Sequence, residues 1–254
     1  STLLGNGNTV VVELAEKLSH VVPVDDPRFL FASDGAAAVE QALKVAFQYW
    51  WNRGGTGRER YLVLGDAYHG DTVGSLSLGA GGFGTDLFDP LRFPGVVRCD
   101  GYRNRDWLAP ALETLSRTGP SLAAAVIEPL VQGAAGMYVA DPADVATFVA
   151  ACQEAGVLVV CDEVATGVGR TGALFASERC GVRPDLMTIG KGLAGGYLPM
   201  SATVASGRVA EAFDGEDLGP RTFYHGHSFG GNALAAAVAV RHLDLFPEWD
   251  VLGH

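Results

Sequence analysis

Two short stretches decide the fold class of this chain: VLVVCDEV at residues 157–164 and LMTIGKG at residues 186–192. Each begins with a run of mostly apolar residues that a charged residue follows, Asp162 in the first stretch and Lys191 in the second. Short apolar runs of this kind predict strands that are buried on both faces, as in a parallel sheet covered by helices. We therefore expect two buried strands with a polar side chain at the end of each.

Outside these stretches the chain alternates predicted strands with predicted helices. The strands are expected at residues 29–32, 61–64, 123–127, 157–161, 186–189 and 202–205, and the helices at 10–21, 36–52, 143–154 and 232–246. Apolar residues spaced three and four apart support the second helix, whose expected apolar face is Val39, Ala42, Leu43, Ala46, Phe47 and Trp50. Residues 79–94, rich in glycine and proline, predict a long irregular loop. The pattern indicates a single α/β domain with a mostly parallel sheet sandwiched by helices.

Length and composition narrow the class of protein. The chain has 254 residues, of which 48% are apolar, enough for one large α/β domain with a sizeable core. Its net charge of −11 argues against nucleic acid or an anionic membrane as a partner. The four cysteines form no CxxC pair, so we expect reduced thiols in a cytoplasmic protein.

The ends of the sequence show neither a signal peptide nor an initiator methionine. No run approaches the roughly 18 apolar residues that span a bilayer. The C-terminus follows directly on a helical pattern. We expect residues 1–254 to be one cofactor-binding domain of a longer protein.

Unusual polar residues follow the predicted strands: Asp34-Gly35, Tyr68-His69, Glu128, Asp162 and Lys191. In open α/β sheets the ligand site lies at the carboxyl ends of the strands. We therefore expect these residues to share one site.

Lys191 and Asp162 together predict an enzyme that uses pyridoxal 5'-phosphate (PLP). A lysine amine binds the aldehyde of this cofactor as a Schiff base, and a carboxylate keeps its pyridinium nitrogen protonated. Gly190 and Gly192 beside the lysine allow a close approach of backbone and cofactor. A solvated lysine and a helix-capping aspartate are the alternative interpretations, but a carboxylate that leaves a buried strand needs a partner.

Three further segments allow two interpretations each. Ser33-Asp34-Gly35 precedes the strongest helix, whose first N–H groups suit a phosphate, although the same sequence is also an ordinary helix cap. Tyr68 suits stacking on a planar cofactor, or pairing with His69 in a buried turn. Two histidines in residues 224–232 suggest a metal, but without a third ligand cluster an anion-binding helix entry is favoured and no metal is expected.

The block CDEVATGVGRTG at residues 161–172, followed by Pro184-Asp185 and Gly190-Lys191-Gly192, resembles the signature of the class III (subgroup II) PLP-dependent aminotransferases. The resemblance runs through essentially the whole chain. Within that family, AFQYW at 46–50, YHGDT at 68–72, EPLVQGA at 128–134 and LPMSAT at 198–203 are similar to the branch that acts in biotin biosynthesis. The resemblance implies the large domain of a fold-type I transferase, which moves an amino group from S-adenosylmethionine to 8-amino-7-oxononanoate to give 7,8-diaminononanoate.

The resemblance also implies roles for individual residues and a homodimer with active sites at the subunit interface. It makes Lys191, Asp162 and Tyr68 catalytic, and Tyr68, Lys191 and Gly226 substrate-binding. The cofactor-binding set that it implies is Gly35, Ala36, Tyr68, His69, Glu128, Asp162, Val164, Lys191, His227 and Ser228, the last two acting on the neighbouring subunit's cofactor.

The chain departs from the family in two dipeptides. The family often has Gly-Ser at Gly35-Ala36, where a hydroxyl is therefore absent, and Pro-Thr at His227-Ser228, where a hydroxyl is kept. The family's N-terminal substrate-lining aromatics and its C-terminal small domain have no counterpart in this sequence.

Other activities remain open at this point. They are another class III transaminase with an ω-amino acid, ornithine or amine donor, a PLP-dependent decarboxylase or aminomutase on the same fold, and a truncated PLP-binding fragment without activity. A fold does not by itself fix the reaction type.

Overall fold

A seven-stranded sheet in the order β1-β9-β8-β7-β4-β2-β3 forms the centre of the computed structural model, which describes residues 7–81 and 84–253. Its strands are β1 (Arg28–Ala32), β2 (Arg60–Leu64), β3 (Val96–Cys99), β4 (Leu122–Ile127), β7 (Leu158–Asp162), β8 (Leu186–Ile189) and β9 (Ser201–Ala205). Strand β9 pairs antiparallel with both neighbours, and the other pairs in this sheet are parallel. The predicted mostly parallel sheet is confirmed. A small hairpin, β5 (Val131–Gln132) and β6 (Tyr138–Val139), lies apart from it.

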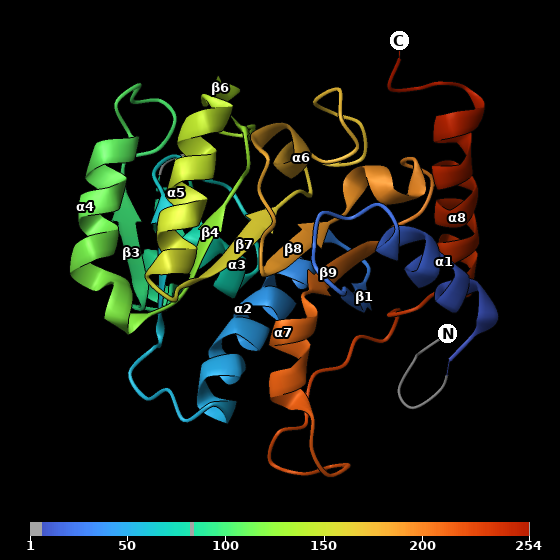
Figure 1. Cartoon of the computed structure of the whole chain (residues 1–254), viewed down its shortest axis with the longest axis horizontal. Coiled ribbons are helices and arrows are strands. Elements are labelled where there is room, and N and C mark those ends of the chain that lie inside the picture. Colours follow the sequence, from blue (N-terminus) through green and yellow to red (C-terminus); the bar gives the residue numbers. More distant parts are fainter. Residues whose placement is uncertain (1–6, 82–83, 254) are drawn as a thin grey trace.

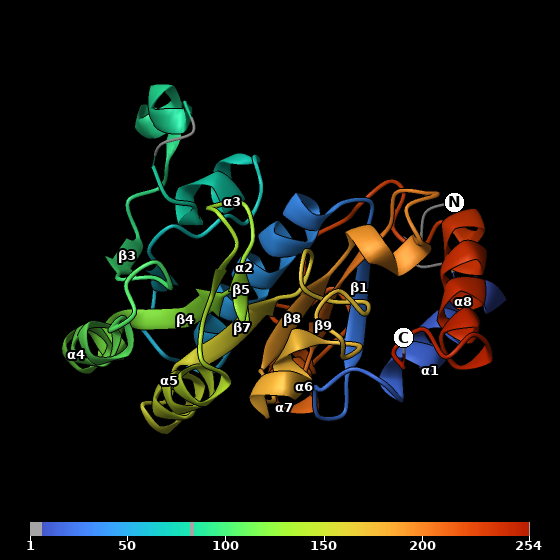
Figure 2. The same ribbon diagram turned by 90° about the horizontal axis from the view of Figure 1, so that it is seen from above.

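Helices cover both faces of the sheet. They are α1 (Thr9–Ser19), α2 (Gly35–Asn52), α3 (Val73–Leu78), α4 (Leu108–Thr118), α5 (Pro142–Glu154), α6 (Ala176–Cys180), α7 (Gly207–Ala210) and α8 (Ala233–Glu248), with 3₁₀ turns η1 (Thr85–Leu91), η2 (Gly119–Ser121), η3 (Lys191–Ala194) and η4 (Glu211–Phe213). Helices α1 and α8 lie side by side at one end of the sheet, and α4 and α5 lie at the other (Figure 1 and Figure 2). Helix α2 packs against one face of the sheet, and α4 and α5 pack against the opposite face. Successive residues of the central strands alternate between these two faces, so that one set contacts α2 and the other contacts α4 and α5.

The predicted strands and long helices are present, with ends shifted by a few residues. The pattern missed β3, the hairpin of β5 and β6, and the helices α3, α4, α6 and α7, and the expected irregular loop at 79–94 contains the turn η1. The predicted apolar face of α2 wrongly includes Phe47, whose side chain is 41% exposed. The sheet covers the stripe that contains Ala42 and Ala46, and Phe47 lies on the flank beyond it.

Strand parity determines which side chains reach the site. In β7, Leu158 and Val160 face the α2 side, so Asp162 faces that side as well. Asp162 is the register partner of Thr188 in β8. Two polar side chains on neighbouring buried strands are thereby placed together.

Candidate active site

A cavity of about 1010 Å³ lies at the carboxyl ends of the parallel strands. It is lined by eight of the predicted site residues: Gly35, Ala36, Tyr68, His69, Glu128, Asp162, Val164 and Lys191. These residues come from segments up to 156 positions apart (191 − 35), and the sheet topology brings them to one edge. The predicted shared site is therefore present as a geometric feature.

Asp162 is buried, and three donors hold its carboxylate. Its Oδ1 accepts hydrogen bonds from the Thr188 hydroxyl at 2.9 Å and the Val164 N–H at 3.1 Å. Its Oδ2 lies 2.7 Å from Nδ1 of His69. An ionised carboxylate has about four acceptor positions. The arrangement leaves roughly one position for a further donor.

Glu163, the other half of the acidic pair, has a structural task. Its oxygens accept hydrogen bonds from the Thr166 hydroxyl, the Ala176 N–H, and both the N–H and the hydroxyl of Ser177. Burial nevertheless raises the pKa of Glu163. Consecutive residues of an extended chain point to opposite faces. Asp162, the last residue of β7, therefore faces the cavity, while Glu163, the next residue, binds the first N–H groups of α6.

Carboxylates from three elements hold the loop that follows β2. Glu128 accepts the backbone N–H of Tyr68 at 3.0 Å, and burial raises the pKa of Glu128. Asp162 contacts His69, as described above. Glu40 of α2 accepts the Thr72 hydroxyl at 2.5 Å and the N–H groups of Gly74 and Ser75 at 2.8 and 3.2 Å. The loop is thus fixed at both ends, and so is the position of Tyr68.

Tyr68 lies in the cavity wall, and its hydroxyl donates to Asp71 Oδ2 at 2.9 Å. Burial and this hydrogen bond raise the pKa of Tyr68 to about 12. The phenol therefore stays neutral at physiological pH and keeps its own proton, which it donates in the hydrogen bond to Asp71.

Lys191 has an unusual backbone for a residue with a side chain. Its φ angle is +38°, in the left-handed region, at the start of the turn η3. Such a conformation costs of order 1–3 kcal/mol and persists when the surroundings enforce it, often at functional sites. The side chain is exposed and makes no ion pair with any residue in 7–81 or 84–253. The amine at the cavity is thus available to a ligand.

The start of α2 offers backbone donors to the same cavity. Asp34 caps the helix by accepting the Ala37 N–H at 2.8 Å, and the Asp34 carbonyl accepts the Ala38 N–H. The N–H groups of Gly35 and Ala36 have no acceptor within the described parts of the chain. A ready anion site results.

Gly35 is required by the approach of α2 to the strand end. A methyl group on Gly35 would lie 2.5 Å from Val164 Cγ1. Val164 also lies 3.4 Å from the position of a methyl on Gly190. At Gly190 that distance is an ordinary van der Waals contact, so only Gly35 is required by the close approach to Val164.

Gly226, His227 and Ser228 do not line the cavity of their own chain. His227 Nδ1 accepts the Phe229 N–H, so its Nε2 carries the proton and donates to the Ser33 hydroxyl at 3.1 Å. The segment is therefore anchored beside the start of α2. The roles expected for it toward a neighbouring subunit stay a prediction.

The residues around the cavity fit PLP. The two free N–H groups at the start of α2 suit its phosphate, Asp162 has an acceptor position for its pyridine N–H, and Lys191 presents an unpaired amine. Val164 and Tyr68 provide apolar and aromatic surface for the ring. The residues that would hold this cofactor are among those that the sequence patterns indicated, and their roles stay a prediction.

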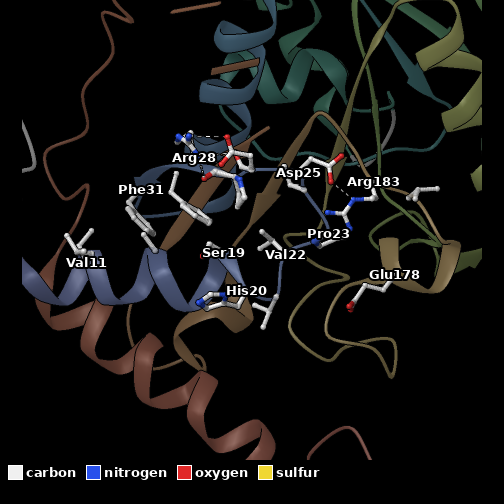
Figure 3. A pocket seen from close by; sticks show the side chains of 18 of the residues that line it. Val11, Ser19, His20, Val22, Pro23, Asp25, Arg28, Phe31, Glu178 and Arg183 are labelled. Carbon is white, nitrogen blue, oxygen red and sulfur yellow. Dashed lines mark hydrogen bonds and ion pairs between the residues drawn. The ribbon is translucent and has the colours of Figure 1, made fainter. Parts of the chain in front are cut away.

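A second hollow of about 1220 Å³ lies between α1, β1 and the end of α6 (Figure 3). It is larger, but none of the predicted site residues lines it. Four of its charged groups are already paired, Arg183 with Asp25 and Arg28 with Asp26, both at 2.7 Å, and Glu178 accepts the Phe175 N–H at 2.8 Å. The chemistry therefore favours the smaller cavity.

Sequence reasoning missed Thr188, Asp71 and Glu40. Thr188 was visible as a lone hydroxyl in an apolar strand that leads to Lys191. Asp71 lies three residues from its partner Tyr68, within the same short motif, whereas Glu40 contacts Thr72, more than 30 positions away, so no local pattern could identify Glu40. Tyr197 and Met137, also in the cavity wall and both exposed, likewise carried no pattern.

No group of three or more histidine, cysteine, aspartate or glutamate side chains is placed to hold a metal in 7–81 and 84–253. Within the same ranges no helix combines the length and apolarity that crossing a bilayer demands.

Comparison with known proteins agrees with this geometry. The family model described as aminotransferase class-III matches residues 3–253. A curated adenosylmethionine-8-amino-7-oxononanoate aminotransferase of Nitratidesulfovibrio vulgaris is 44% identical, over 98% of this chain and 48% of the relative. The chain spans about half the length of that relative.

Solved structures of two activities share the fold. The crystal structure of adenosylmethionine-8-amino-7-oxononanoate aminotransferase from Methanocaldococcus jannaschii superimposes with a TM-score of 0.94 at 34% identity, over 100% of this chain and 58% of the other. A thermostable (S)-enantioselective omega-transaminase from Thermomicrobium roseum gives 0.89, also at 34% identity, over 98% and 58%.

Proposed function

The chain belongs to the class III aminotransferases, and from this premise we propose that the protein transfers the amino group of S-adenosylmethionine to 8-amino-7-oxononanoate, giving 7,8-diaminononanoate. PLP is the proposed cofactor. The curated relatives' names support the choice of substrates. The chain spans 48% to 59% of these relatives, so residues 1–254 are proposed to form the cofactor-binding domain of this activity.

One observation carries the proposal: a lysine, a fixed carboxylate, an aromatic ring and free helix N–H groups surround one cavity. Each group alone has an ordinary structural explanation. Their convergence from four parts of the chain matches the four chemical features of one cofactor, namely aldehyde, pyridine nitrogen, ring and phosphate.

PLP, when bound, supplies an electron sink for the carbon that carries the amino group. The residues of this chain supply orientation and proton transfer. The Nζ of Lys191 takes up and returns the proton at that carbon, because it is the unpaired amine in the cavity wall. Asp162 holds the charge at the pyridine nitrogen, and Tyr68 stays neutral beside the ring.

We propose that the protein is a homodimer in which Gly226 contacts substrate and His227 and Ser228 reach the neighbouring subunit's cofactor phosphate. Apolar side chains on the projecting segment around η1 support an intersubunit contact, since Leu87 and Leu91 are 80% and 60% exposed. Figure 2 shows this segment extending away from the sheet. Light scattering on the full-length protein tests the dimer, and a monomeric mass at assay concentration would contradict it.

An amino-donor assay on the purified full-length protein tests the substrates. We expect amino transfer with S-adenosylmethionine and 8-amino-7-oxononanoate, and loss of transfer in the Lys191→Ala variant. PLP-type absorbance of the resting protein should change in that variant.

The second candidate is an amine or ω-amino acid transaminase. It is favoured by the similarity to the omega-transaminase structure, at the same 34% identity. Turnover with an ω-amine donor, together with none from S-adenosylmethionine, would select this candidate and overturn the first.

A further inference from the structure

His69 is the buried titratable group whose role the proposed reaction leaves open. Its side chain is fully buried, and its Nδ1 lies 2.7 Å from Asp162 Oδ2. Its other ring nitrogen, Nε2, is also buried and has no hydrogen-bond partner within the described residues. Only one side of the imidazole is therefore used.

The contact determines where the proton lies. An ionised carboxylate only accepts hydrogen bonds, so Nδ1 carries a proton and donates to Asp162. Burial lowers the pKa of His69, but the hydrogen bond to Asp162 and the charge of that carboxylate outweigh it, so the pKa is raised overall. The other charged group that acts on His69, Glu128, favours the protonated ring as well.

The unpartnered nitrogen separates two explanations. A histidine that serves only to pack or connect its loop would be expected to satisfy both nitrogens, because a buried unpaired polar atom costs about 1–3 kcal/mol. The loop is in any case held by Glu128 and Glu40. What His69 adds is the third donor on the carboxylate of Asp162, beside Thr188 and Val164.

We propose that His69 is a positioning residue that holds the carboxylate of Asp162 in place, so that Asp162 keeps the pyridine nitrogen of PLP protonated. The inference rests on the proposed function, since it concerns the cofactor expected in this cavity. His69 acts on Asp162 through one donor atom, Nδ1. The proposed role therefore needs a hydrogen-bond donor at the position of Nδ1 and no group at the position of Nε2.

Replacements of His69 can separate the two nitrogens. His69→Asn places an amide N–H where Nδ1 lies and removes Nε2. His69→Leu keeps apolar bulk and removes the donor, and His69→Gln, whose amide reaches beyond the Nδ1 position, serves if the leucine variant does not fold. Ser177→Ala is the matched control, because it removes a buried hydrogen bond to Glu163, the neighbour of Asp162, without touching the cavity.

The measurements are the ¹⁵N chemical shift of ¹⁵N-labelled PLP bound to the full-length protein, and the PLP dissociation constant. We expect a protonated pyridine nitrogen in the wild type, His69→Asn and Ser177→Ala. In His69→Leu or His69→Gln the shift should move toward the unprotonated form. The dissociation constant should rise about tenfold, which corresponds to about 1.4 kcal/mol.

Two results would overturn the role of His69. One is an unchanged ¹⁵N shift and affinity in the variants without the donor. The other is a loss in His69→Asn equal to that in His69→Leu. If the wild-type protein binds no PLP, the proposed function fails and this role fails with it, and that outcome is distinguishable because it appears before any substitution.

Discussion

Replacing Gly35 by alanine should destabilise the protein at the point where helix α2 meets the cofactor site. The new methyl carbon would lie 2.5 Å from Val164 Cγ1 and 3.0 Å from Cγ2. Non-bonded carbon atoms prefer about 3.5–4.0 Å. The first turn of α2 or the Val164 side chain must therefore move.

The magnitude follows from the cost of overpacking, about 1–3 kcal/mol of unfolding free energy for an added methyl in a well-packed place. Val164→Ala removes both Cγ atoms and leaves Val164 Cβ at 3.3 Å, a tight but tolerable distance. The double variant should therefore recover a large part of the loss. Because the N–H groups of Gly35 and Ala36 are the proposed phosphate donors, PLP affinity should fall together with stability.

Urea unfolding of the full-length protein, followed by circular dichroism, measures the change, and a PLP titration accompanies it. Gly133→Ala is the control, because it lines the same cavity but its added methyl meets nothing within 4 Å. We expect the control to be near wild type. A Gly35→Ala variant as stable as Gly133→Ala, or a double variant no better than the sum of the single ones, would refute the steric argument.

Three further outcomes are expected. Lys191→Ala should lower the rate of amino transfer by roughly 10²–10⁴-fold or more, which steady-state kinetics measures. It should change the unfolding free energy, measured in urea, by less than about 1 kcal/mol, because the exposed side chain has no ion-pair partner in the described residues. Retained amino transfer would exclude the role assigned to Lys191. Glu163→Gln should cost about 1–3 kcal/mol, because each carboxylate oxygen accepts one backbone N–H, from Ala176 or Ser177, and the amide N–H₂ would face one of them with no acceptor; a stability equal to wild type would contradict this. The pKa of Tyr68 is about 12 in the folded protein, above its usual value of 10.0, so its share of the stability is fully present below pH 10 and is lost as pH rises toward 12. Unfolding midpoints measured across that window should fall less in Tyr68→Phe than in wild type, and parallel curves would count against the shifted Tyr68.

The sequence by itself indicated six of the seven strands of the main sheet, the fold class and eight residues that line the cavity. Apolar runs such as 157–161 and 186–189 have one stable environment, the middle of a sheet covered on both faces, so their local pattern was sufficient. Asp162 was visible because a carboxylate that leaves a buried strand is costly unless it has a partner. Lys191 was visible because two glycines flank it at the end of such a strand.

Short helices and strands were not predicted, because their sequence pattern is ambiguous. Strand β3 has four residues and α3 has six, too few for a period to show. Phe47 was placed in the core because periodicity gives the direction of a side chain and not the extent of the sheet that covers it.

Only the tertiary structure decided how the site residues are held. Because side chains alternate along the extended chain, Asp162 faces the cavity and Glu163 faces the start of α6. The parallel pairing of β7 with β8 places Thr188 beside Asp162. His69 lies 93 positions from its partner Asp162, so no local pattern could reveal the contact. Hydrogen bonds depend on distances in space, and the spacing of residues along a chain does not contain those distances until the sheet has formed.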